Sequence, residues 1–234
     1  MKNNIKKLEF PTILASSVHD MKNSLAMLLG SLADISSGCQ AETCSIKNKL
    51  LRIQHEGQRV NRDLIQLLTL YKIDQSQYYL NTTEVNIYDY LEEIILEYKY
   101  LLNERGIDIS LQCDTALNGF FDAELVSSVI KTIINNAYQY ADDKILVSGE
   151  SIDGFIKLTI ADNGKGYPAH MLSEQKTRKT TSDFGTGSTG LGLYFSSQVA
   201  ELHKNKHKYG YIQITNSINN SSELKGGCFS IFLP

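Results

Sequence analysis

The feature that most constrains this chain is a regular spacing of apolar residues near its N-terminus. The first run recurs in steps that alternate between four and three residues: Leu14, Val18, Met21, Leu25, Leu28, Leu32 and Ile35. A second run has the same alternation: Ile46, Leu50, Ile53, Gly57, Val60, Leu64, Leu67 and Tyr71. This is the period of helices that pack in a supercoiled bundle. The sequence therefore predicts a hairpin of two long helices, over about 11–36 and 43–73.

Each predicted helix has a single apolar stripe, so the two helices of one chain cannot cover their own apolar surface. A second copy of the chain would complete a four-helix bundle. The alternative is an intramolecular hairpin that lies on the rest of the chain. We expect the homodimer.

His19 lies one residue off the apolar seam, where the helix would hold it at the edge of the buried stripe and facing water. Asn23 is one turn further along the same face, and the neighbouring side chains there are small. Asp20 follows directly and can hydrogen-bond one imidazole nitrogen, which leaves the lone pair of the other nitrogen available. Taken alone, this is an ordinary surface histidine, so its meaning depends on the rest of the chain.

The remaining sequence predicts a second domain over residues 82–234, after a hairpin domain at 1–74 and a polar linker at 75–81. Strands are expected around 107–111, 145–147, 156–160, 212–214 and 229–233, and helices around 91–101, 125–137 and 191–202. The fold class is α+β, with helices on one face of a mixed sheet. Residues 173–188 lack periodicity and are expected to form a loop.

Two polar segments of this second domain suggest ligand contacts. Alternate residues of a strand point to the same face, and Asp162 follows Ile156, Leu158 and Ile160 at this spacing. Its carboxylate would therefore lie on the apolar face, where it needs a partner. Gly164 and Gly166 allow the backbone to approach a ligand closely. Further on, Gly187-Ser188-Thr189-Gly190-Leu191-Gly192 leads directly into a helix. The free N–H groups at the start of a helix favour phosphate, and no Gly-Lys-Ser/Thr follows that would make a Walker loop.

The helix at 125–137 has a polar line, formed by Thr132, Asn136 and Tyr140, opposite its apolar side. One face would therefore pack in the core and the other would face a ligand. An amide oxygen such as that of Asn136 is a suitable hard ligand for Mg²⁺.

Taken in order along the chain, His19, Asn136, Asp162-Asn163-Gly164-Lys165-Gly166 and Gly187–Leu193 resemble the histidine protein kinases of two-component signalling. The resemblance runs from about residue 12 to 234. It implies a four-helix dimerisation bundle followed by an α/β sandwich that binds ATP, of the GHKL type. It further implies an ATP-dependent autokinase that phosphorylates its own histidine. The phosphoryl group then passes to an aspartate of a response-regulator receiver domain, and phosphatase activity towards that regulator is expected as well.

The resemblance also assigns roles to single residues. His19 is the expected phosphoacceptor, supported by Asp20, and Asn23 is expected to position the water for dephosphorylation. Asp162 is expected to accept a hydrogen bond from the adenine amino group, and Asn136 to bind Mg²⁺. The remaining residues expected at the ATP site are Gln139, Tyr140, Gly164, Gly166, Arg178, Thr189, Gly190, Leu191 and Gly192, with Arg178 in a lid over the phosphates.

Three positions depart from the family pattern. Thr132 stands where a second asparagine is frequent, Gln139 where a basic residue is common, and Ser24 where a proline often follows the phosphoacceptor. The first two would weaken phosphate binding or transfer. They keep an alternative open, namely a histidine phosphotransferase or phosphatase scaffold with a weakened ATP-binding domain. A GHKL ATPase related to gyrase and a serine kinase are further alternatives, but both would lack the histidine-bearing hairpin.

Composition sets limits on location and partners. The net charge of −3 gives no case for nucleic acid or an anionic membrane, and no apolar run approaches the length of a membrane span. We therefore expect a cytoplasmic protein. Since 18 residues precede His19, the signal is expected to come from a separate sensor protein. The four cysteines show no metal-ligand spacing, although a redox role for Cys39 and Cys44 is conceivable. The other four histidines match no motif and are expected at the surface.

Overall fold

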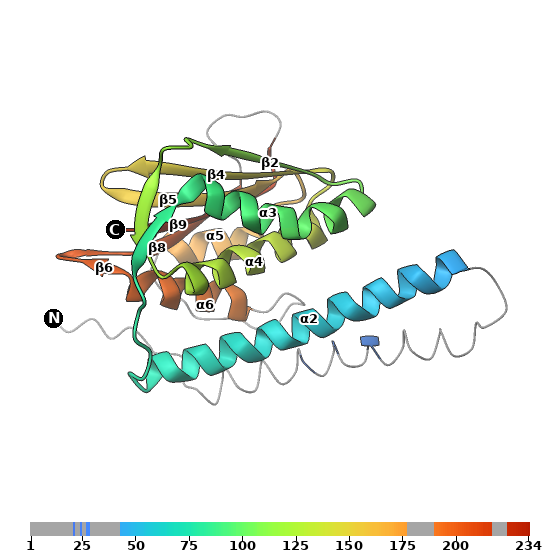
Figure 1. Cartoon of the computed structure of the whole chain (residues 1–234), viewed down its shortest axis with the longest axis horizontal. Coiled ribbons are helices and arrows are strands. Elements are labelled where there is room, and N and C mark those ends of the chain that lie inside the picture. The colour runs from blue at the N-terminus through green and yellow to red at the C-terminus, as the bar shows by residue number, and fades with distance from the viewer. Residues whose placement is uncertain (1–20, 22–23, 25–26, 29–42, 177–189, 217–223) are drawn as a thin grey trace. The chain divides into compact units, whose positions relative to one another are not determined.

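The computed structural model describes residues 21, 24, 27–28, 43–176, 190–216 and 224–234 (Figure 1). The chain divides into two compact units. One is built mainly from residues 79–181 and 192–234, and the other mainly from residues 6–78. The first unit contains the sheet and the helices that pack on it, and the second contains the long helix α2, Thr43–Asp74.

A five-stranded mixed sheet forms one layer of the first unit. Its strands are β2 (Asp108–Cys113), β4 (Lys144–Ile152), β5 (Phe155–Asp162), β8 (Tyr211–Asn216) and β9 (Gly227–Leu233). They lie in the order β2-β4-β5-β9-β8. The pair β2–β4 is parallel and the other three pairs are antiparallel. The expectation of a mixed sheet is confirmed.

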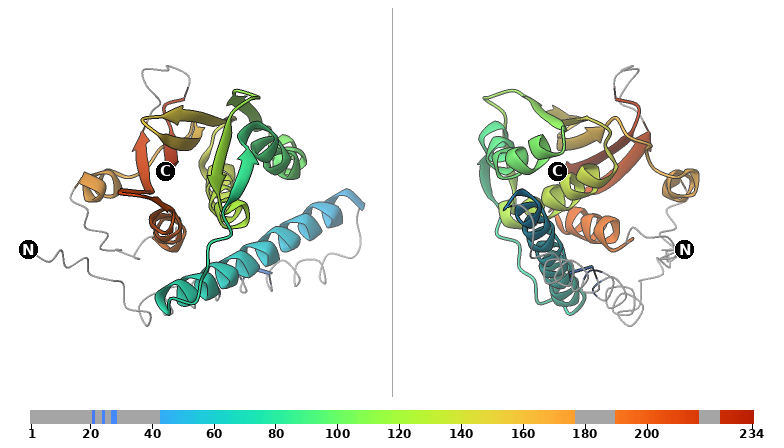
Figure 2. Two further views of the ribbon diagram at one scale, coloured as in Figure 1. Left: turned by 60° about the vertical axis from the view of Figure 1, so that its left-hand side comes forward. Right: turned by 90° about the vertical axis from the view of Figure 1, so that its right-hand side faces the viewer.

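Helices form the second layer of this unit. They are α3 (Ile87–Glu104), α4 (Ala123–Tyr140), α5 (Ala169–Lys176) and α6 (Gly190–Leu202). Figures 1 and 2 show α3, α4 and α6 on the same face of the sheet. Two of these helices begin at a side-chain cap, because Asn86 accepts from the N–H of Asp89 and Asp122 accepts from the N–H of Leu125.

The core lies between these layers, and alternation along the strands decides which side chains enter it. In β5, Leu158 and Ile160 are buried and lie opposite Ile231 and Phe229 of β9. The intervening residues, among them Thr159 and Ser230, face away from the helices. Their hydroxyls lie 2.9 Å apart and share a hydrogen bond. The predicted parity of β5 is thus confirmed.

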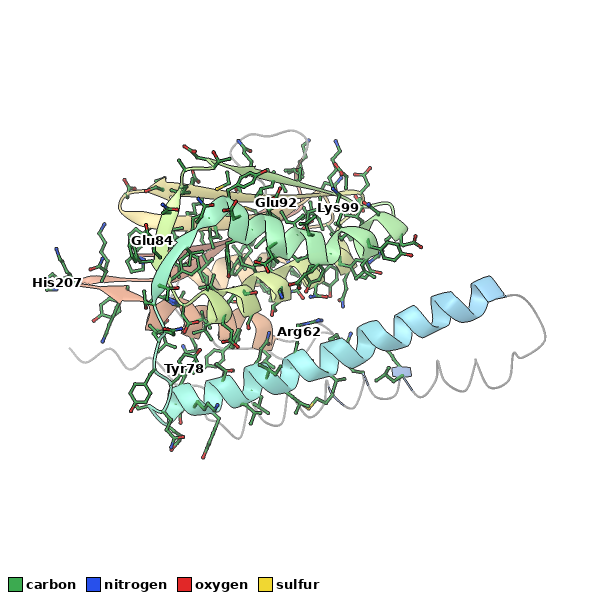
Figure 3. The ribbon with its side chains drawn as sticks, viewed as in Figure 1. Arg62, Tyr78, Glu84, Glu92, Lys99 and His207 are labelled. Carbon is green, nitrogen blue, oxygen red and sulfur yellow. The ribbon has the colours of Figure 1, made fainter. Side chains whose placement is uncertain are left out.

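Two small antiparallel sheets complete the first unit, and the sequence did not predict either of them. One pairs β1 (Thr83–Asn86) with β3 (Asn118–Phe121). The other pairs β6 (Lys204–Asn205) with β7 (Lys208–Tyr209). Figure 3 shows His207 at the tip of this second hairpin.

The helix α2 carries apolar side chains on more than one face. Leu67 and Leu70 are buried, whereas Leu64, Ile65, Leu68 and Tyr71 are 42–59% exposed. Two residues of the predicted seam, Leu64 and Tyr71, are therefore partly exposed. Ser24 of the preceding segment is fully buried, and its hydroxyl accepts hydrogen bonds from Nε (2.9 Å) and Nη2 of Arg59.

Candidate nucleotide-binding site

Asp162 ends strand β5 on the face that the helices cover. Its Oδ1 accepts hydrogen bonds from the backbone N–H of Gly164 (2.8 Å) and of Gly227 (3.1 Å). Burial raises the pKa of this carboxyl, and those two N–H groups oppose the shift. Within the described part of the chain, Oδ2 accepts no hydrogen bond. The carboxylate is therefore fixed through one oxygen, and no described residue donates a hydrogen bond to the other.

Gly164 lies against the C-terminal end of α4. A Cβ atom at this position would come within 1.9 Å of the carbonyl oxygen of Tyr140, a backbone atom that cannot turn aside. Gly166 has a φ of +74°, a left-handed conformation that favours glycine. It lies beside Asn216, whose side chain accepts from the N–H of Tyr167 (2.6 Å) and donates to its carbonyl (2.8 Å). Both glycines are thus required by geometry, and the loop is tied to α4 on one side and β8 on the other.

Helix α4 places the expected ligand residues near this loop. Asn136 is half-buried, and Gln139 and Tyr140 are exposed, with Tyr140 accessible over half its surface. The neighbouring amide of Asn135 is buried and donates to the hydroxyl of Tyr98 (2.8 Å). Asn136 is therefore the asparagine of this pair that can reach a ligand.

The hydroxyl of Thr132 forms a hydrogen bond within α4 and does not face a ligand. The residue is buried, and its hydroxyl donates to the carbonyl of Ser128 (2.7 Å). Its methyl group would lie 2.9 Å from a Cβ at Gly192, so the second glycine of α6 packs directly on α4 one turn before Asn136. The start of α6 and the polar line of α4 are consequently brought together.

Helix α6 begins at Gly190, so its first backbone N–H groups have no partner within the helix. With the helix dipole, such groups favour an anion. Leu191 is 1% exposed and packs as a core residue. Among the expected phosphate-binding residues of α6, the backbones of Gly190 and Gly192 remain suited to direct contact.

Several predicted residues cannot be placed. His19, Asp20, Asn23, Arg178 and Thr189 lie outside the described residues. The described residues at the site are Asn136, Gln139, Tyr140, Asp162, Gly164, Gly166, Gly190, Leu191 and Gly192.

The residues at the site suit a hard cation that takes few ligands from the protein. Among the described residues, no group of three or more His, Cys, Asp or Glu side chains could hold a metal ion. The amide oxygen of Asn136 can supply one protein ligand, and Mg²⁺ usually completes its shell with water and phosphate oxygens.

Two sequence-based expectations were wrong. Residues 173–176 were expected in a loop but form the end of helix α5, and His203 is not at the surface. It is 4% exposed, its Nε2 accepts from the N–H of Asp122 (3.1 Å), and its Nδ1 lies 2.8 Å from the carbonyl of Val199. Burial lowers the pKa of this imidazole, so it is held neutral with the proton on Nδ1. Gly227, which binds Asp162, was also missed.

A depression of about 540 Å³ lies elsewhere, on the face of the sheet that points away from the helices. Ser148, Thr159 and Ser230 are among its lining residues. None of the nucleotide-site residues lines it, so it belongs to a different surface from the site described above.

Comparisons with known proteins find a matching family model and similar sequences. Residues 121–234 match the family model described as "Histidine kinase-, DNA gyrase B-, and HSP90-like ATPase". The chain is 25% identical over 228 residues to the Sensor protein SrrB of Staphylococcus aureus, a match that covers 94% of this chain and 37% of that protein. The chain thus spans little more than a third of the length of this relative.

Solved structures share the fold. The Acinetobacter baumannii histidine kinase AdeS matches with a TM-score of 0.63 at 19% identity, covering 92% of this chain and 96% of that chain. Full-length ShkA in complex with AMPPNP matches with a TM-score of 0.61 at 16% identity, covering 97% of this chain and 46% of that chain. No helix in the described ranges is long and apolar enough to cross a membrane.

Asp162, helix α4 and the start of α6 all lie within residues 121–234, the range that the family model matches. The family resemblance seen in the sequence is confirmed to this extent: residues 121–234 match the model of the histidine kinase-, DNA gyrase B- and HSP90-like ATPases, and the chain is similar in sequence to a sensor protein.

Proposed function

We propose that the chain is a homodimeric histidine kinase that uses ATP to phosphorylate His19. The observation that carries this proposal is the arrangement of Asp162, α4 and the start of α6 in one ATPase domain. The hairpin sequence that bears His19 precedes that domain in the same chain. The relatives and structural neighbours are a sensor protein and histidine kinases, which supports the same activity.

The described residues suggest how ATP would be bound. Oδ2 of Asp162 accepts a hydrogen bond from the adenine amino group, while Gly164 and Gly227 hold Oδ1. The backbone N–H groups at Gly190 and Gly192 bind phosphate oxygens, because they begin a helix. When bound, Mg²⁺ would neutralise phosphate charge, and Asn136 is the residue that would hold it.

The reaction follows from imidazole chemistry. The free nitrogen of His19 attacks the γ-phosphorus, the bond to the bridging β,γ-oxygen breaks, and ADP leaves with that electron pair. Asp20 holds the proton on the other imidazole nitrogen and stabilises the positive charge that develops during attack. The product is a phosphoramidate, from which the phosphoryl group passes to an aspartate of a response-regulator receiver domain.

The apolar surface of α2 supports the dimer. Leu64, Ile65, Leu68 and Tyr71 form an exposed apolar surface on one helix, and isolated soluble proteins rarely leave such a surface uncovered. A second copy of the hairpin would bury it in a four-helix bundle. Because ATP is the substrate, we place the protein in the cytoplasm, where it would receive its signal from a sensor.

A second candidate is a phosphotransferase or phosphatase scaffold with weak ATP binding. It is favoured by the neutral character of the ligand side of α4, where Thr132 is buried and Gln139 carries no charge. Phosphatase activity towards the regulator is compatible with both candidates. Replacing Asn23 with alanine should slow dephosphorylation of the regulator more than labelling of His19.

Incubation with ATP labelled at the γ-phosphate distinguishes the two candidates. A kinase gives label on the protein that acid removes, because phosphoramidates are acid-labile. A scaffold binds regulator but acquires no label from ATP. Label that survives acid would indicate a hydroxyl acceptor and therefore a serine kinase.

A further inference from the structure

Asn163 belongs to the Asp162–Gly166 segment, yet its side chain does not take part in the proposed binding of ATP. Its Oδ1 accepts from the N–H groups of Asp143 (3.2 Å) and Lys144 (3.0 Å). Its Nδ2 donates to Oδ1 of Asp143 at 2.6 Å. Its backbone N–H donates to the carbonyl of Lys144 at 3.3 Å. All four hydrogen bonds go to one short segment of chain, formed by Asp143 and Lys144.

That segment is the end of the connection from α4 to β4 together with the first residue of β4. The connection begins directly after Tyr140, while Asn163 follows directly after Asp162. The β4–β5 ladder ends at the pair of Ile145 with Asp162. Beyond it, Gly164 approaches the carbonyl of Tyr140, which is a steric contact without a hydrogen bond. The side chain of Asn163 therefore adds directional bonds past the end of the ladder, between the two chain segments that bear Tyr140 and Asp162.

We infer that Asn163 is a positioning residue that sets the separation between Tyr140 and Asp162, and with it the fit of the purine base. This inference rests on the proposed function, because it assumes that Asp162 contacts the adenine amino group and that Tyr140, which is expected at the ATP site, lies against the base. It assigns to Asn163 a role that is distinct from the roles of Asp162 and Gly164.

The identity of the side chain matters because of charge. An aspartate at 163 could still accept from the two N–H groups, but its second oxygen would face the carboxylate of Asp143 where the amide now donates. Asp162 is a further carboxylate one residue away. The amide alone meets both demands, with an acceptor for the backbone and a neutral donor for Asp143.

The test is the substitution Asn163→Asp in the full chain, with its compensating partner Asp143→Asn. Affinities are measured by calorimetry for ATP and for purine riboside triphosphate, which lacks the exocyclic amine. Asn163→Asp should weaken ATP binding by about tenfold, the scale of a lost hydrogen bond to a charged group. It should weaken binding of the analogue less, so that the ratio of ATP affinity to analogue affinity falls towards one.

The double variant Asn163→Asp/Asp143→Asn exchanges donor and acceptor and has the same net charge as the natural chain. It should recover both ATP affinity and the preference for ATP. Asn205→Asp, at an exposed site in β6, adds the same charge elsewhere and should change neither. A thermal unfolding curve for each variant shows whether the domain remains folded.

Two results would overturn the inference. One is an unchanged ratio of ATP to analogue affinity in Asn163→Asp, and the other is failure of the double variant to recover. These differ from failure of the proposed function, in which the natural chain itself binds no ATP or shows no preference for the amine.

Discussion

Replacing Asp162 with asparagine separates the binding role of this residue from its structural role. The amide oxygen of the new side chain can still accept from Gly164 and Gly227, so the turn that Oδ1 now holds should persist. The amide nitrogen would occupy the place of Oδ2 and present a donor to the adenine amino group. Two donors would then face each other, and one of them would be buried without a partner.

An unsatisfied buried donor costs about 1–3 kcal/mol. Since about 1.4 kcal/mol corresponds to a factor of ten, ATP affinity should fall roughly five- to a hundredfold. Stability should not fall: burial raises the pKa of Asp162, so ionising this carboxyl is less favourable in the folded chain than in the unfolded chain. The amide relieves that cost, so the unfolding temperature should stay the same or rise.

Calorimetric titration with ATP and with purine riboside triphosphate measures this effect, alongside thermal unfolding. The loss should be large for ATP and small for the analogue, which has no amine to place. Equal losses for the two nucleotides would refute the adenine contact. A large fall in unfolding temperature would show instead that Oδ1 needs the full carboxylate charge to hold the turn.

Three further predictions concern other parts of the domain. The buried, neutral His203 has a pKa below its usual 6.5, so the unfolded chain binds the proton first as the pH falls. The free energy of unfolding should therefore decrease as the pH drops below 6.5. In urea unfolding, His203→Gln should show a weaker dependence of stability on pH in that range. Gly164→Ala forces a methyl group against the backbone of Tyr140 and should lower the free energy of unfolding in urea by about 1–3 kcal/mol. The control Gly57→Ala places its methyl group where nothing lies within 4 Å, and it should stabilise α2 by about 0.5–1 kcal/mol. Equal effects of the two substitutions would contradict the close approach of Gly164 to Tyr140. Gln139→Lys adds a cation to an exposed position beside the site and should raise the initial rate of labelling by ATP, and an unchanged rate would show that the missing charge is not what limits transfer.

The sequence predicted those parts of the fold that follow a local period. The strand at 156–160 alternates apolar and polar residues, and the helix at 125–137 carries one apolar face, so both could be placed without a structure. The pairs β1–β3 and β6–β7 could not. Their strands have four or two residues, too few to show an alternation, and each is stabilised by pairing with another segment.

Local periodicity also predicted the position of Asp162 near the end of β5. It could not predict contacts between residues that are far apart in the sequence. The parity of β5 placed Asp162 on the covered face, and glycines indicated close approach. The burial of His203 depends on Asp122, which lies 81 residues earlier, and the tie between Asp162 and Gly227 spans 65 residues. Such contacts follow from the packing of whole elements, and no local pattern of side chains reports them.

The most direct test of the central claim is labelling of the natural chain and of His19→Gln with ATP that carries its label on the γ-phosphate. The natural chain should acquire label that acid removes, and the variant should acquire none while retaining its ATP affinity and its dimer. Full labelling of the variant, or label on the natural chain that resists acid, would contradict the assignment of His19 as the phosphoacceptor.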